Sequence, residues 1–122
     1  MQFWLLISAA TLSLAGALFH GILGHRLYMG NINESNLVAE TKILSLVSWH
    51  MFTLILLVGA GTLAYLTYSP ALVLMAYPII LINAFGALMF LMLGLSRHRR
   101  LLKLPGLYLM SITAALSWIA IS

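Results

Sequence analysis

The charged residues of this 122-residue chain occupy only two short segments. They are, in the first segment, Arg26, Glu34, Glu40 and Lys42, and in the second, Arg97, Arg99, Arg100 and Lys103. Three uncharged runs remain, at residues 1–25, 43–96 and 104–122. Because a helix needs about 20 apolar residues to cross a bilayer, this pattern predicts membrane-spanning helices.

The composition supports a lipid-facing surface. Hydrophobic residues make up 63% of the chain and charged residues only 7%, with a mean hydropathy of +1.08, whereas a soluble domain has about a quarter charged residues. The net charge is +4, and the Lys and Arg residues that produce it lie at the ends of apolar runs. This position favours a role in membrane orientation over nucleic-acid binding. The chain has no cysteine, so disulfide and thiolate chemistry are excluded.

The middle run is long enough for two spans, with a natural break at Tyr68-Ser69-Pro70. We therefore expect a single integral membrane domain over residues 1–122, an all-α four-helix transmembrane bundle of up-down-up-down topology. The expected helices cover about residues 2–24, 36–67, 71–96 and 105–121.

The distribution of basic residues predicts the orientation. With four spans, both charged segments lie on one side and both termini on the other. Lys and Arg occur only in the two charged segments, and such loops are cytoplasmic by the positive-inside rule. Five aromatic residues form an expected belt near the other face: Trp4, Tyr65, Tyr68, Tyr77 and Trp118. The sequence thus predicts a multi-pass protein of the bacterial inner membrane with periplasmic termini.

Two histidines stand out because ionisable side chains are costly inside a membrane and often functional there. If the first two spans centre near Ser13 and Leu56, then His20 and His50 lie about 10 Å and about 9 Å to the cytoplasmic side of the midplane. Sequential antiparallel helices are usually neighbours. We therefore expect the two imidazoles to meet and to bind haem b or a transition-metal ion, in an electron-transfer or cofactor-handling context.

The residues around His20 leave room for such a ligand. Ser13, Gly16 and Gly24 share its helix face, which is otherwise made of small residues. His25 is five positions further on, about 140° around a regular helix. It can become a third metal ligand only if the regular helix ends near Gly24.

Other interpretations stay open. His20 and His50 can be packing residues that hydrogen-bond across helices. The chain can also be an accessory or scaffold subunit of a larger membrane complex. A third alternative is a small homo-oligomeric transporter, with Asn83 and Thr53 joining the histidines along a polar path.

No catalytic residue is predicted, because the chain lacks hydrolase, phosphate-binding and nucleophile motifs and has no aspartate. Enzymatic activity is therefore not expected. Besides the bilayer itself, the expected partners of the second charged segment are anionic lipid headgroups. The residues expected to contact them are Arg97, Arg99, Arg100 and Lys103.

The motif His20-Gly21-Ile22-Leu23-Gly24-His25, followed by Trp49-His50, resembles a family of small bacterial four-helix membrane proteins. Its members read His-Ser-x-Leu-Gly-Glu at the end of helix one and Trp-His near the start of helix two. The likeness covers about residues 17 to 55 and implies the architecture and a shared histidine pair, but no particular activity. Here Gly21 replaces the serine and His25 the glutamate, so an imidazole stands where the family has a carboxylate. The small multidrug transporters are of similar size, but they carry a glutamate within helix one, which this chain lacks.

Overall fold

The chain is helical from end to end in the computed structural model, which describes residues 1–122 and contains no strand. The elements are, in order, α1 (Gln2–Leu18), η1 (Phe19–Met29), α2 (Gly30–Asn33), α3 (Ala39–Tyr68), η2 (Pro70–Met75), α4 (Ala76–Ser96), η3 (Arg99–Lys103) and α5 (Pro105–Ile121). The all-α prediction is therefore confirmed.

Three helical segments are long and apolar enough to cross a membrane: Gln2–Asn33, Ala39–Tyr68 and Pro70–Ser96, the last of which is kinked at Leu72. The fourth, α5, has 17 residues and is therefore about 25 Å long, somewhat less than a hydrocarbon core of about 30 Å. The first helix continues through η1 and α2 to Asn33 instead of ending near residue 24, and α3 begins at Ala39 instead of residue 36.

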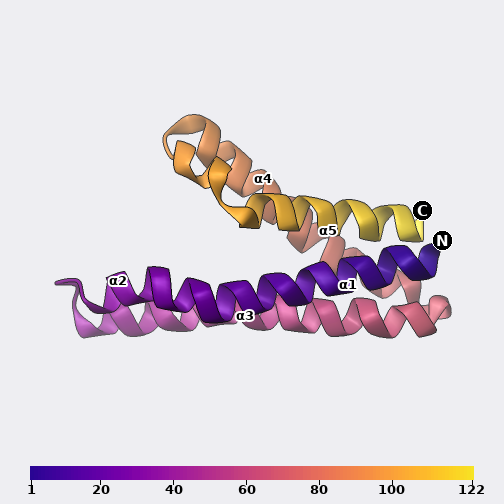
Figure 1. The fold of residues 1–122 in the computed structure, drawn as a ribbon, viewed down its shortest axis with the longest axis horizontal. Helices are drawn as coiled ribbons and strands as arrows, with labels where there is room; N and C mark the ends of the chain where they lie inside the picture. The colour runs from indigo at the N-terminus through magenta and orange to yellow at the C-terminus, as the bar shows by residue number, and fades with distance from the viewer.

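The helices are arranged as two pairs joined through α1 and α5. The first helix packs along α3, α5 packs on both α1 and α4, and α3 and α4 have little contact. In Figure 1 the α4–α5 pair diverges from the α1–α3 pair toward the end of the molecule that carries α2, while both termini lie at the opposite end.

The core lies where the two pairs converge, near the termini. It consists of Leu6, Ala9, Ala10, Leu63, Leu66, Ala76, Ile80 and Ala120. Half of these residues are alanines, whose small side chains let helices approach closely.

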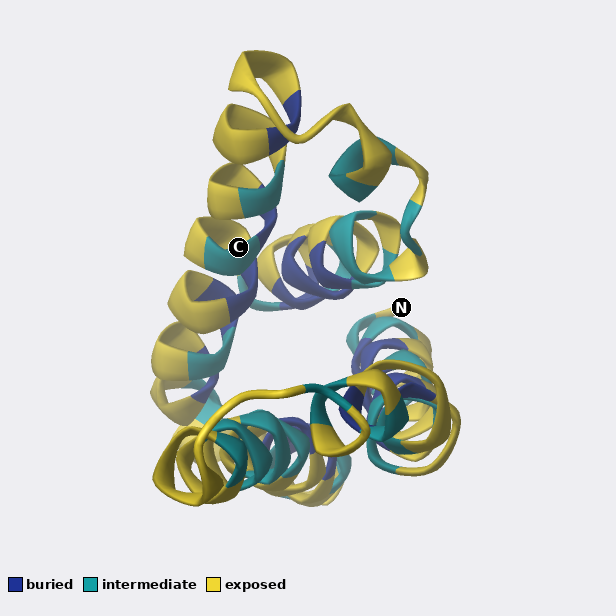
Figure 2. Cartoon of the chain, turned by 90° about the vertical axis from the view of Figure 1, so that its left-hand side faces the viewer, coloured by how far each residue is buried: buried dark blue, intermediate teal, exposed yellow.

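The buried faces of the helices point inward and their outer faces are exposed, as Figure 2 shows. Only 23 of the 122 residues are buried, and the exposed ones include large apolar side chains such as Val58, Phe85 and Met92. An apolar surface this extensive is suited to lipid rather than water. Two buried polar side chains, Ser13 and Asn83, donate to the backbone carbonyls of Leu56 and Ile79, whereas the buried Ser117 hydroxyl has no partner.

Candidate functional site

The segment η1 interrupts the regular α-helix with an 11-residue π-helix, from Phe19 to Met29. In a π-helix each N–H bonds the carbonyl five residues back, so residues five apart lie close to the same face. His20 and His25 are five apart, and both contact α3. The sequence analysis assumed regular turns and placed them on different faces; the wider turns are the reason that they share one.

His20 makes three contacts with α3. Its Nδ1 lies 2.8 Å from the Thr53 hydroxyl oxygen, and its ring stacks on the Trp49 indole with centroids 4.1 Å apart and an interplanar angle of 10°. The Trp49 Nε1–H also donates to the carbonyl oxygen of His20, at 2.9 Å. These contacts fix both the ring and the backbone of His20.

The contacts of Thr53 are compatible with a proton on Nδ1 of His20. When the Thr53 hydroxyl donates to the Trp49 carbonyl oxygen, 3.5 Å away, its own oxygen can accept from Nδ1–H of His20. The neutral ring then has its lone pair at Nε2, which bonds no other group of the chain. His20 therefore presents an oriented imidazole nitrogen to a ligand.

His50 pairs with His25 rather than with His20. The His25 Nδ1 and His50 Nε2 atoms are 3.1 Å apart, and the ring centroids are 5.1 Å apart. The structure therefore pairs His50 with His25, and it places His20, the expected partner of His50, against Thr53 and Trp49 instead.

A cavity of about 590 Å³ lies between the two helix pairs, within the range of about 300–1,000 Å³ usual for cofactor sites. Its wall is mostly apolar and includes Gly16, Phe19, His20, Trp49, Phe52, Leu56, Asn83, Met89, Phe90, Leu101, Leu104, Leu109, Met110 and Thr113. His20 is the only histidine in the wall, because neither His25 nor His50 lines the cavity.

The expected polar path is only partly assembled. Asn83 is buried in the cavity wall, where its Nδ2 donates to the Ile79 carbonyl of its own helix. Thr53 lies outside the cavity lining and is engaged by His20.

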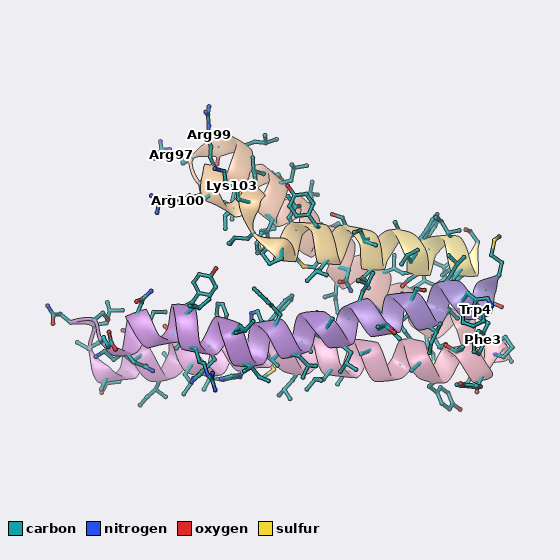
Figure 3. All side chains as sticks on the ribbon, viewed as in Figure 1. Phe3, Trp4, Arg97, Arg99, Arg100 and Lys103 are labelled. Atoms are coloured by element: carbon teal, nitrogen blue, oxygen red, sulfur yellow. The ribbon has the colours of Figure 1, made fainter.

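The basic cluster, defined as Arg97, Arg99, Arg100 and Lys103, lies at the end of the molecule opposite Phe3 and Trp4, as Figure 3 shows. Residues 96–101 line a second hollow of about 750 Å³, here called the basic hollow, which includes His98. Leu101 lines both the basic hollow and the apolar cavity. The two glutamates of the chain both lie in the other charged segment, so no carboxylate neighbours the cluster in sequence.

No group of three or more His, Cys, Asp or Glu side chains forms a ready metal site. Comparisons of the chain with protein-family models, with curated proteins and with solved structures found no match. The chemistry of the site is therefore inferred from its own residues.

The contact between η1 and α3 predicts a strong effect at Gly24. A Cβ on Gly24 would lie 2.6 Å from Cζ2 of Trp49, whereas a Cβ on Gly61 would meet nothing within 4 Å. We expect Gly24→Ala to push the indole off His20 and to destabilise the protein by about 1–3 kcal/mol, measured as resistance to unfolding in mixed detergent micelles. Gly61→Ala is the matched control and is expected to be neutral or stabilising. Equal stability of the two variants would contradict the close packing at Gly24.

Proposed function

We propose that this chain is a small protein of the bacterial inner membrane that binds haem b in the cavity between its helix pairs, where Nε2 of His20 would bind the iron. Its context would be electron transfer or cofactor handling. The observation that carries the proposal is that His20 lines an apolar cavity while α3 fixes its ring through Nδ1 and leaves Nε2 without a partner in the chain.

The surroundings of His20 match those of histidines that bind metals. Such histidines almost always donate their other ring N–H to a hydrogen-bond acceptor, which fixes the tautomer and the ring orientation. Thr53 is that acceptor here, at 2.8 Å. Stacking on Trp49 restrains the ring further, so little ordering would remain to be done on binding.

The cavity suits the shape and polarity of haem b, a flat and largely apolar molecule with two carboxylates. The apolar wall would contact the macrocycle. The carboxylates would be accepted by the basic hollow, which adjoins the cavity at Leu101 and contains Arg97, Arg99 and Arg100.

The geometry favours His20 alone over the bis-histidine ligation by His20 and His50 that the sequence suggested. His50 faces His25 through its Nε2 and does not line the cavity. For His50 to bind the same iron, its contact with His25 would have to break.

The absorption spectrum of protein purified after haem supplementation tests the proposal. We expect a Soret band, its near-complete loss in His20→Ala, and about 10- to 100-fold weaker haem binding in Thr53→Val, which removes the acceptor for Nδ1–H. His50→Ala, outside the cavity wall, should keep the band.

Two outcomes would contradict this assignment. Equal loss of the band in His20→Ala and His50→Ala would show bis-histidine ligation. A colourless wild-type protein that also fails to bind added haem would rule out the haem site. Co-purification of a partner would then favour the accessory-subunit alternative, and proton-dependent uptake that needs His20 and Asn83 would favour the transporter alternative.

The proposed orientation has both termini in the periplasm and the basic cluster in the cytoplasm. It is supported by the position of the basic cluster at the end of the molecule opposite both termini (Figures 1 and 3) and by the positive-inside rule.

Because the chain has no native cysteine, single cysteines report this orientation without background. We expect a membrane-impermeant maleimide, added to cells with a permeabilised outer membrane, to label Ser122→Cys but not Ser96→Cys. Lysis of the inner membrane should expose Ser96→Cys as the positive control. Labelling of both sites from the same side of intact membranes would show that α5 does not cross.

A further inference from the structure

The contact between His25 and His50 is not needed by the proposed haem site, yet the chain adopts unusual backbone geometry that permits it. In a regular helix His25 would be turned about 140° from His20. The π-helix from Phe19 to Met29 instead brings it to α3. Departures of this kind occur frequently at functional sites.

The spacing of the two rings is close to that of two ligands on one metal ion. Zinc binds imidazole nitrogen at about 2.0–2.1 Å, so two such nitrogens at a tetrahedral angle lie about 3.4 Å apart. The His25 Nδ1 and His50 Nε2 atoms are 3.1 Å apart, a difference of a few tenths of an ångström. The same two atoms can therefore share either a proton or an ion.

We propose that His25 Nδ1 and His50 Nε2 together bind a divalent transition-metal ion of the kind that imidazole prefers, such as Zn²⁺. No third His, Cys, Asp or Glu joins them. The remaining coordination positions are thus left to water or to an added ligand, which is typical of open sites rather than of closed structural ones.

This ion site is distinct from the cavity. Trp49 and His50 are consecutive on α3, and only Trp49 lines the cavity, together with His20. The two proposed ligands, His25 and His50, do not line the cavity, so the ion site is argued separately from the haem site.

The test is calorimetric titration of the metal-free protein in detergent with Zn²⁺, together with Co²⁺, whose visible spectrum reports the ligand geometry. We expect one ion per chain and at least a tenfold loss of affinity in both His25→Ala and His50→Ala. His20→Ala should bind Zn²⁺ as the wild type does, which separates this site from the haem site. His98→Ala is the control for adventitious binding at an exposed histidine.

A second measurement uses the wild-type protein and so does not depend on the folding of a variant. Bound Zn²⁺ should protect His25 and His50, but not His98, from acylation by diethyl pyrocarbonate, read residue by residue by mass spectrometry. The proposal is overturned if the wild type takes up no Zn²⁺, if His25→Ala and His50→Ala bind it unchanged, or if only His98 is protected. The pair would then be a hydrogen bond and nothing more.

Discussion

The structure of the site depends on the wide turns of η1. An ordinary α-helix from Gln2 to Asn33 would present only one of His20 and His25 to α3. The π-helix presents both. Contacts from α3 compensate for the irregular backbone: the Trp49 indole donates to the carbonyl oxygen of His20, and small residues in η1 make room for bulky ones opposite. Gly24 lies against the Trp49 ring and Gly21 against the Thr53 methyl group.

Unequal packing along the helices produces the cavity. Alanines near the termini bring the two helix pairs together in a compact core. Further along, close packing continues within each pair, as Trp49 against Gly24 and Met110 against Gly86 illustrate, while the pairs diverge (Figure 1). The space between them is therefore apolar and adjoins the basic hollow at Leu101. An oriented imidazole, an apolar cavity and nearby cations together make a site suited to an anionic, flat cofactor.

The membrane character of the chain could be read from its sequence because charge is so unevenly distributed. The two charged segments marked the ends of the apolar helices. The same reasoning found the two helices that carry the histidines, and the similar depth of His20 and His50 in the membrane stays a prediction. Depth follows from counting residues at 1.5 Å each and needs no knowledge of side-chain direction.

The pairing of the histidines could not be obtained in this way, because it depends on the helical period. Gly24 was treated as a point where the helix could end, whereas the backbone continues through it in wider turns. No local residue pattern signals a π-helix; it is favoured by tertiary contacts with Trp49 and Thr53. The cavity could not be predicted from the sequence either, because its wall combines residues from α1, η1, α3, α4, η3 and α5.

Solid-state NMR of the protein in lipid bilayers, with ¹⁵N-labelled histidine, tests the arrangement of the two contacts most directly. A through-space correlation between ring nitrogens of His25 and His50 and none between those of His20 and His50 is the expected result, because only the first pair is in contact at 3.1 Å. A correlation between His20 and His50, with none to His25, would show a regular helix in place of η1 and would contradict this account.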